Sequence, residues 1–261
     1  MIGIFDSGVG GMTVAQAVEN ALPEYRLIYF GDLARSPYGS KSRETIANYA
    51  REDTEFLLSK GAKIIIIACN SAASVASDLL KHDFNVPIFE VITPAIHKAS
   101  TTTTTGNIGV IGTRATIASG IYDQKIRALL TDSRVYSQPC PLLVPLVEEG
   151  WLHKRETKMI IRRYLHPLRS KQVDTLVLGC THYPLLKHLI QPRIGKRVSV
   201  IDSSAEVAAE LRFFLENTPE IAQTLAKDGQ NVYYVSDVTA AAESTAQRIF
   251  GRKIDLQKAI I

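Results

Sequence analysis

The chain has few cysteines, and their number argues against a protein held together by disulfides. Only three occur in 261 residues, and an odd count does not suit a disulfide framework. Cysteines that stay reduced are typical of proteins from reducing compartments. We therefore expect a cytoplasmic protein whose fold depends on its apolar core.

Long apolar runs are also missing. No stretch approaches the roughly 20 apolar residues that a membrane-spanning helix needs. The first residues, Ile2–Phe5, already have the pattern of a strand, and no basic segment precedes them as in a signal peptide. The sequence therefore predicts neither a membrane span nor a signal peptide.

Excess charge of one sign is small. The net charge is +4, from 30 basic and 26 acidic residues, and the basic residues never form a run of five. The densest small cluster, Arg193, Lys196 and Arg197, is explained by a solvated loop. No nucleic-acid partner is expected, because the sequence has no basic stripe.

What the sequence does contain is an alternation of short apolar runs with longer segments of helical period. This alternation predicts an α/β fold with mostly parallel sheets, and nearly continuous apolar runs are typical of strands covered on both faces. The expected strands are 2–5, 27–30, 63–68, 87–91, 108–112, 134–138, 174–178, 198–202 and 231–235. The expected helices are 12–21, 42–59, 72–82, 114–130, 154–169, 183–191, 204–217 and 238–250.

A weak internal repeat predicts two related halves. Ile2–Ser7 resembles Ile108–Thr113 at an offset of 106 (108 minus 2), and Cys69 and Cys180 stand in similar segments at an offset of 111 (180 minus 69). Similar offsets for independent pairs favour a duplicated unit. The low-complexity stretch 100–107 lies near the expected boundary and is predicted to be a linker or exposed loop.

Cys69 and Cys180 occupy matching places after two apolar runs, Ile64–Ala68 and Leu176–Gly179. Ligands of open α/β sheets bind beyond the carboxyl ends of the strands, so the two thiols should flank one cleft if the halves face each other. Two thiols on opposite faces of a substrate suggest a two-base proton transfer. The helix expected after Cys69 should lower its pKa from the usual value of about 8.5. Cys140, which is flanked by prolines outside the repeat, is interpreted as structural.

A glycine-rich loop, Asp6–Gly11, follows the first strand. Its three glycines permit a tight turn and close approach of the backbone to a ligand, and the next helix favours an anion at its N-terminus. Because neither common phosphate-loop pattern matches, a carboxylate-binding loop and a plain structural turn stay open. Asp6 could cap the helix, hold an ammonium group or act on a thiol.

Polar side chains also follow two later strands. Pro37 and Gly39 bracket Tyr38 in a stiff loop that is either a simple turn or the wall of a polar pocket. Asn70 and Ser71, directly after Cys69, can donate hydrogen bonds to a carboxylate.

His182 stands two residues after Cys180 and either shuttles protons or merely begins a helix. Glu148 or Glu149 could orient this imidazole, as carboxylates do, or could be surface residues. Cys69, Cys180 and His182 give only three candidate metal ligands without a recognised spacing, so no metal site is expected.

Four motifs together resemble the glutamate racemase family of the aspartate/glutamate racemase superfamily. They are Phe5–Gly11, Pro37–Gly39, Ala68–Ala72 and Gly179–Pro184. They occur in the family's order and spacing, and the resemblance extends from residue 2 to about residue 217. One departure is Ser71, where the family usually has threonine, although the hydroxyl is kept.

The resemblance implies a cofactor-independent racemase with two pseudo-symmetric α/β domains and an active site between them. The N-terminal domain would comprise residues 1–92 and 208–261, and the second domain residues 93–207. The implied enzyme interconverts L- and D-glutamate, supplies D-glutamate for peptidoglycan synthesis and forms a homodimer.

The resemblance also implies a role for each motif residue. Cys69 removes the α-proton of D-glutamate while Cys180 protonates the opposite face, and the roles reverse for L-glutamate. Asp6 would assist Cys69, and His182, supported by Glu148, would assist Cys180. The implied substrate contacts are Asp6, Ser7, Tyr38, Gly39, Asn70, Ser71, Thr181, His182, Thr113 and Thr116.

Other functions stay open at this point. Aspartate and hydantoin racemases share the superfamily, and the preference for glutamate depends on resemblance alone. A one-cysteine decarboxylase is disfavoured by the second cysteine. A two-lobed protein that only binds an anion, or that serves as a partner-binding regulator, would have no need of two matched thiols.

Overall fold

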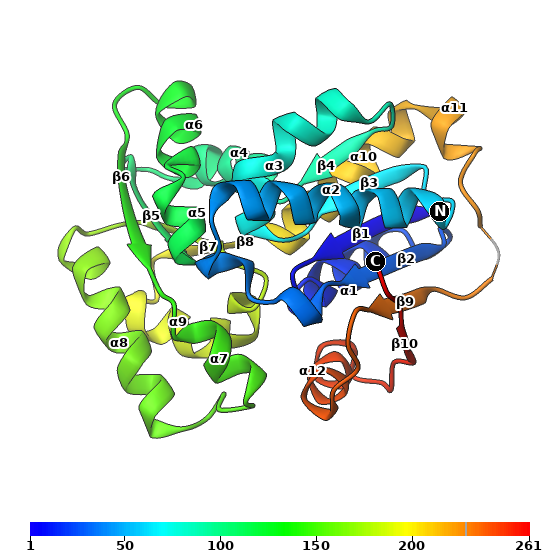
Figure 1. The fold of residues 1–261 in the computed structure, drawn as a ribbon. Helices are drawn as coiled ribbons and strands as arrows, with labels where there is room; N and C mark the ends of the chain where they lie inside the picture. The colour runs from blue at the N-terminus through cyan, green and yellow to red at the C-terminus, as the bar shows by residue number, and fades with distance from the viewer. Residues whose placement is uncertain (228) are drawn as a thin grey trace.

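Two parallel sheets form the framework of the protein. A computed structural model describes residues 1–227 and 229–261. The first sheet has the strand order β10-β9-β2-β1-β3-β4, the second has the order β6-β5-β7-β8, and the strand pairings found among these residues are parallel. Figure 1 shows the second sheet and its helices as a separate lobe beside the first. The strands are β1 (Ile2–Asp6), β2 (Leu27–Gly31), β3 (Ile64–Ile67), β4 (Ile88–Glu90), β5 (Asn107–Gly112), β6 (Arg134–Pro139), β7 (Thr175–Gly179), β8 (Ser199–Asp202), β9 (Val232–Val235) and β10 (Leu256–Lys258).

The internal repeat is visible in the strand order. β2-β1-β3-β4 in the first sheet corresponds to β6-β5-β7-β8 in the second, and β9 and β10 extend the first sheet beyond β2. β1 and β5, the strands that resemble each other in sequence, hold equivalent positions. The predicted α/β fold with two pseudo-symmetric halves is therefore confirmed, and Cys69 and Cys180 follow the equivalent strands β3 and β7.

Helices cover the sheets. Several begin at a side-chain cap that the sequence supplies: Ser42, Thr113 and Thr239 each accept a hydrogen bond from the backbone three residues further on. The helices are α1 (Met12–Ala21), α2 (Arg43–Ser59), α3 (Asn70–Asp83), α4 (Ile92–Thr102), α5 (Arg114–Ala118), α6 (Ile121–Leu129), α7 (Leu143–Glu148), α8 (Arg155–Ser170), α9 (Lys187–Ile194), α10 (Ser203–Asn217), α11 (Pro219–Ala222) and α12 (Ala240–Phe250), with single 3₁₀ turns η1 (Leu33–Arg35), η2 (Tyr38–Ser40) and η3 (Tyr183–Leu186).

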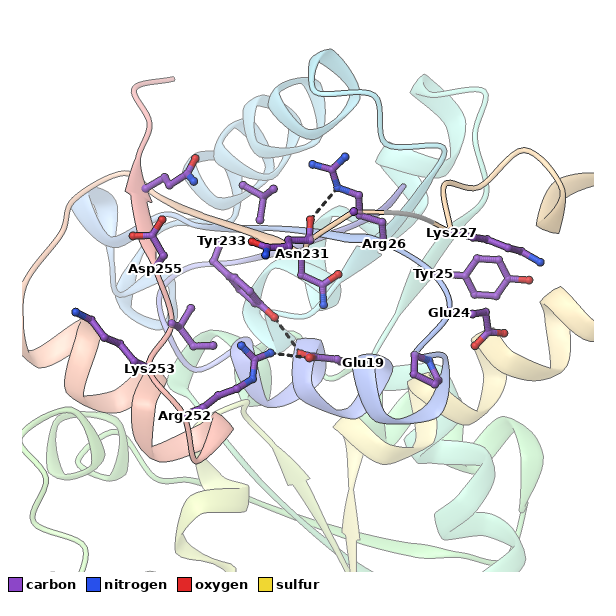
Figure 2. A pocket seen from close by; sticks show the side chains of 16 residues that line it. Glu19, Glu24, Tyr25, Arg26, Lys227, Asn231, Tyr233, Arg252, Lys253 and Asp255 are labelled. Atoms are coloured by element: carbon purple, nitrogen blue, oxygen red, sulfur yellow. Dashed lines mark hydrogen bonds and ion pairs between the residues drawn. The ribbon is translucent and has the colours of Figure 1, made fainter.

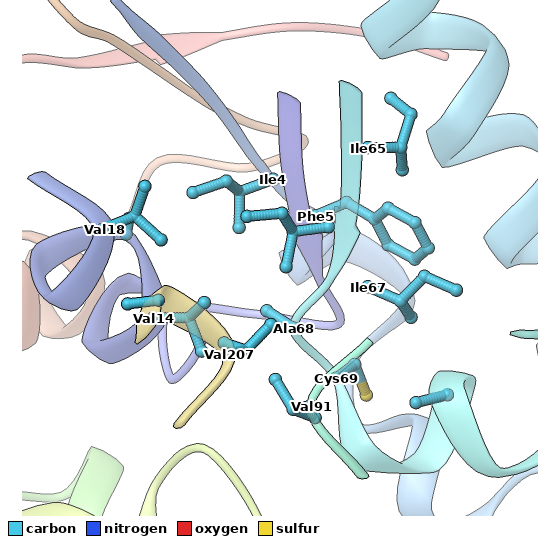
Figure 3. Close-up of a cluster of buried hydrophobic side chains, with 14 of the residues drawn as sticks. Ile4, Phe5, Val14, Val18, Ile65, Ile67, Ala68, Cys69, Val91 and Val207 are labelled. Atoms are coloured by element: carbon cyan, nitrogen blue, oxygen red, sulfur yellow. The ribbon is translucent and has the colours of Figure 1, made fainter. Parts of the chain in front are cut away.

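The apolar strands form the core that fixes the first cysteine. Each residue of β3 is fully buried, and burying an isoleucine side chain stabilises the fold by about 1.5–3 kcal/mol. Figure 3 shows Ile4 and Phe5 on β1 beside Ile65 and Ile67 on β3, with Cys69 just beyond the end of β3. The thiol thus lies next to a fully buried part of the core.

The threonine-rich stretch is only in part the linker or exposed loop that its composition predicts, with Thr104 and Thr105 exposed. Residues through Thr102 complete α4, a helix that was not predicted. The next three threonines then surround Asp174, whose carboxylate accepts hydrogen bonds from the hydroxyls of Thr103, Thr104 and Thr105 and from two of their backbone amides. The low complexity concealed this role because the partner lies about 70 positions away in the sequence.

One predicted helix needs correction, and some short elements were not predicted. The helix expected over 114–130 is divided by Gly120, which adopts a left-handed backbone conformation (φ +69°) between α5 and α6. The short elements α7 and β10 were not predicted, because a few residues carry little periodicity.

No helix formed by the described residues is both long and apolar enough to span a membrane.

Candidate active site

Both thiols open onto one small cavity between the two sheets. Cys69 follows β3 after one residue, Ala68, Cys180 directly follows β7, and each cysteine is 5% exposed. The cavity has about 20 Å³ of free space, enough for about one water molecule. The walls come from both halves of the chain: Ser7, Ser36, Pro37, Gly39, Cys69, Asn70, Ser71, Thr113, Val144, Cys180, Thr181 and His182.

Cys69 is a thiol in the ligand-free protein. Burial raises its pKa to about 12, and the nearby Asp6 carboxylate acts in the same direction. Hydrogen bonds from the backbone of Ala72 and from Ser7, whose Oγ lies 3.6 Å from the Cys69 sulfur, oppose this shift without cancelling it. The pKa lowering that we predicted from the start of α3 is therefore wrong, because desolvation outweighs the helix terminus.

Asp6 lies behind the cavity wall. It is buried and accepts hydrogen bonds from the backbone amide of Gly8 (3.0 Å) and from the hydroxyl of Thr181 (3.3 Å). Burial raises the pKa of Asp6, whereas the neighbouring His182 lowers it. Asp6 does not cap α1, whose N-cap position is Gly11.

The glycine-rich loop lets two protein segments approach each other. A Cβ atom added to Gly10 would lie 2.3 Å from Nδ1 of His182 and 2.6 Å from Oγ1 of Thr181. The absence of a side chain here is needed for packing against these two residues, which follow Cys180. The close backbone approach that the glycines permit is therefore to the second half of the chain.

A chain of three side chains leads away from Cys180. The Cys180 sulfur lies 3.9 Å from Nδ1 of His182, and Nε2 of His182 lies 3.2 Å from Oε1 of Glu148. Burial lowers the pKa of His182, but the contacts with Cys180 and Glu148 prevail and raise it to about 10. His182 is thus an imidazolium at neutral pH. Of the two glutamates considered, Glu148 is the one that meets this ring.

Hydroxyl groups from both halves meet beside Asn70. The Oγ of Ser71 on α3 lies 2.9 Å from Oγ1 of Thr113 and 3.4 Å from Oγ1 of Thr116, which belong to the start of α5. Thr113 and Thr116 are 3.0 Å apart. Ser71 and Thr113 line the cavity, whereas Thr116 is buried behind them.

Tyr38 does not direct its side chain into the cavity. Its hydroxyl lies within hydrogen-bond distance of carboxylate oxygens of both Asp32 and Asp53 (2.9 Å to Asp53), and all three side chains are fully buried. Arg35 lies 2.5 Å and 3.1 Å from the same two carboxylates. Burial and the charge of Asp32 raise the pKa of Asp53 well above its usual range, whereas Tyr38 and Arg35 lower it. The neighbours Ser36, Pro37 and Gly39 form the cavity wall instead.

Tyr122 was missed in the sequence. Its hydroxyl donates to Oδ1 of Asn70 at 2.7 Å, from α6 in the other half of the chain. Tyr122 lies in a helical stretch with no recognisable motif, so no pattern in the sequence indicated it. Ser36 and Val144 were also not predicted as cavity residues.

A much larger hollow, of about 730 Å³, lies elsewhere. It is near the start of β2, β9 and β10, at the end of the first sheet opposite Cys69 (Figure 2). Glu19 there pairs with Arg252 and accepts a hydrogen bond from Tyr233. Its lining contains neither cysteine nor histidine, so its size does not make it the site of proton transfer. Within the described part of the chain, no three histidine, cysteine or acidic side chains are grouped as metal ligands.

Comparisons with known proteins agree with this geometry. The sequence matches the profile of the Asp/Glu/Hydantoin racemase family over residues 12–211. The chain is 43% identical to a glutamate racemase of Geobacter metallireducens over 97% of its own length and 93% of the relative's. A glutamate racemase structure from Bacillus anthracis superposes with a TM-score of 0.93 at 35% identity, covering 99% of this chain and 97% of the other. The structure of the Francisella tularensis glutamate racemase in complex with D-glutamate gives a TM-score of 0.90 at 33% identity, covering 100% and 96%.

The chain belongs to the Asp/Glu/Hydantoin racemase family. The relatives that match nearly its whole length are glutamate racemases, so both the resemblance and the prediction of a racemase are confirmed. An aspartate racemase of Picrophilus torridus, at 20% identity and a TM-score of 0.57, shares the fold.

Proposed function

We propose that this chain interconverts L- and D-glutamate by moving the α-proton between two cysteines, without a cofactor. The observation that carries the proposal is that Cys69 and Cys180 reach the same cavity from equivalent ends of repeated halves. Glutamate as the substrate is supported by the names of the relatives, and by relatives solved with D-glutamate and with L-glutamate.

The surroundings of the two sulfurs differ. Cys69 is a thiol because burial raises its pKa to about 12. The Cys180 sulfur lies 3.9 Å from Nδ1 of His182, a ring that can shuttle protons. When L-glutamate is bound, Cys180 as thiolate removes the α-proton and Cys69 as thiol protonates the opposite face.

The product of that step is D-glutamate with Cys69 as thiolate and Cys180 as thiol. The reverse reaction uses this second form, so every proton removed from one face is matched by one delivered to the other. The ammonium group of the bound substrate would stabilise a Cys69 thiolate, since a positive charge lowers the pKa of a neighbouring acid. Asp6, whose carboxylate accepts hydrogen bonds from Gly8 and Thr181, would lie on the side of the site that binds the substrate ammonium group.

The carbanion intermediate needs fixed donors and little water. The cavity has room for about one water molecule, which suits a reaction that depends on preorganised dipoles. We assign these donor roles to cavity residues from both halves: Ser7, Asn70, Ser71, Thr113, Thr181 and the backbone near Gly39. Tyr38 and Thr116 would act by holding these groups in place.

The remaining assignments depend on the similarity to glutamate racemases. We propose that the D-glutamate supplies peptidoglycan synthesis in the cytoplasm, that the enzyme is a homodimer, and that residues 1–92 with 208–261 and residues 93–207 act as two domains. The relatives, which match nearly the whole chain, support the role in D-glutamate supply. The three free cysteines suit the cytoplasm, and the two separate sheets suit two domains.

Proton exchange followed by NMR in D₂O tests the proposed reaction. Purified protein without added cofactor is offered L-glutamate, D-glutamate, L-aspartate and D-aspartate separately. We expect deuterium at the α-carbon with inversion for both glutamate enantiomers. Exchange with aspartate alone would overturn the substrate and keep the mechanism. Exchange with none of the four would overturn the proposed function.

A further inference from the structure

Asn70 presents an unpartnered donor in the wall of the cavity. It is 2% exposed, and its Nδ2 atom has no hydrogen-bond partner among the described residues. A buried polar group without a partner is costly, so such a group at a reaction site points to a ligand atom that completes it. A donor of this kind matches a carboxylate oxygen and not an ammonium group, which has only donors to offer.

Tyr122 decides which end of the Asn70 amide is free. The tyrosine hydroxyl donates to Oδ1 at 2.7 Å, which occupies the carbonyl and leaves Nδ2 as the free end. Burial raises the pKa of Tyr122 well above its usual value, so the hydroxyl keeps its proton and stays a donor. Rotation of the amide by half a turn would turn Oδ1 away and leave the tyrosine proton without this acceptor.

The ring of Tyr122 meets the other catalytic segment. A Cβ atom added to Gly179, the residue before Cys180, would lie 3.3 Å from the tyrosine ring. One side chain on α6 therefore touches the residue that precedes Cys180 and bonds the residue that follows Cys69. Asn70 follows a strand of the first sheet, whereas Gly179 belongs to the second sheet. The hydrogen bond between Tyr122 and Asn70 therefore exists only while the two halves are together.

We propose that Tyr122 is a positioning residue for the racemase reaction: through its hydroxyl it fixes the Asn70 amide so that Nδ2 receives a carboxylate of the substrate. This inference is built on the proposed glutamate racemisation. Tyr122 itself does not line the cavity, and it acts through Asn70.

The substitution Tyr122→Phe tests this role because it keeps the ring against Gly179 and removes only the hydroxyl. We expect KM for both glutamate enantiomers to rise about tenfold with a smaller change in kcat, since a lost ground-state contact appears mainly in KM. Tyr233→Phe is the matched control: it also removes one hydrogen bond of a buried tyrosine, far from the cavity, and should leave KM unchanged.

A double-mutant cycle separates positioning from general destabilisation. Asn70→Ala should raise KM, and adding Tyr122→Phe to it should raise KM no further if the tyrosine acts through the amide. Independent, multiplying effects would overturn the proposal, as would an unchanged KM in Tyr122→Phe. A variant that only loses stability would show a lower melting temperature and a smaller active fraction with normal KM, which also contradicts it. If the wild-type protein does not racemise glutamate in the same assay, the proposed function fails before this role is tested.

Discussion

At the scale of single residues, the two cysteines are expected to be equally necessary although their surroundings differ. Cys69→Ser and Cys180→Ser should each reduce racemisation by about 10³-fold or more, because a serine hydroxyl is a far poorer acid and base at neutral pH and positioned proton transfer contributes about 10²–10⁴-fold. Circular dichroism of each glutamate enantiomer over time measures the loss.

Cys140→Ser is the control for those variants. Cys140 is fully buried, and its sulfur lies 3.5 Å from the carbonyl of Gln138, outside the cavity. It should keep racemase activity close to that of the wild type. If either of the other serine variants racemises glutamate at a near wild-type rate, the two-base scheme is wrong.

The imidazole beside Cys180 gives a prediction about pH. Because Glu148 helps to raise the pKa of His182 to about 10, Glu148→Gln should lower that pKa. His182 is protonated below its pKa and loses its positive charge above it, so the alkaline fall in kcat/KM should begin at a lower pH in the variant. The pH profile of kcat/KM measures the shift.

Glu149→Gln supplies a matched comparison, since Glu149 is the exposed neighbour of Glu148. Its profile should coincide with that of the wild type. An unshifted alkaline limb in Glu148→Gln would show that the charge on His182 does not control the reaction.

At the scale of elements, the loop that carries Tyr38 has contacts that differ from the role its motif implies. The resemblance assigns Tyr38 to substrate binding, whereas its hydroxyl is held by Asp32 and Asp53. Tyr38→Phe should therefore lower the free energy of unfolding by about 1–3 kcal/mol, because two buried carboxyl groups lose a partner. It should change kcat/KM much less than the cysteine variants do. Urea unfolding and steady-state kinetics give the two numbers.

Tyr49→Phe serves as the reference for that variant, since its ring packs on Tyr38 with centroids 5.4 Å apart and it is only partly buried. A Tyr38→Phe protein of normal stability with little activity would instead indicate direct contact between Tyr38 and the substrate.

Most strands and their ends could be predicted, because continuous apolar runs such as Ile64–Ile67 have few other interpretations. The motif residues at those ends, including Cys69 and Cys180, were found for the same reason. Tyr122 and the partners of Asp174 could not be predicted, because each depends on a contact between segments far apart in the chain. The pKa of Cys69 was misjudged because burial depends on the packing of both halves.

At the scale of the whole molecule, the repeat explains how one chain places two thiols in one cavity. In each half, a cysteine lies just beyond the end of the equivalent strand, β3 or β7. Two similar units that face each other bring these strand ends together. The sequence predicted two halves, but their mutual arrangement depends on contacts such as that between Ser71 and Thr113. Those contacts also close the cavity.

The cavity is too small for glutamate, so the halves must separate for the substrate to bind. Its free space of about 20 Å³ holds about one water molecule, and both cysteines are 5% exposed. We expect iodoacetamide to modify Cys69 and Cys180 only when the halves open, and saturating D-glutamate to slow both reactions, because the occupied site is shut. Mass spectrometry of the two cysteine-containing peptides over time measures the rates.

Cys140 is buried within one half, so its slow modification should not respond to glutamate. Equal rates with and without D-glutamate at Cys69 and Cys180 would contradict the closure. Protection of only one of them would mean that glutamate covers one sulfur alone, which is incompatible with an α-carbon held between two thiols.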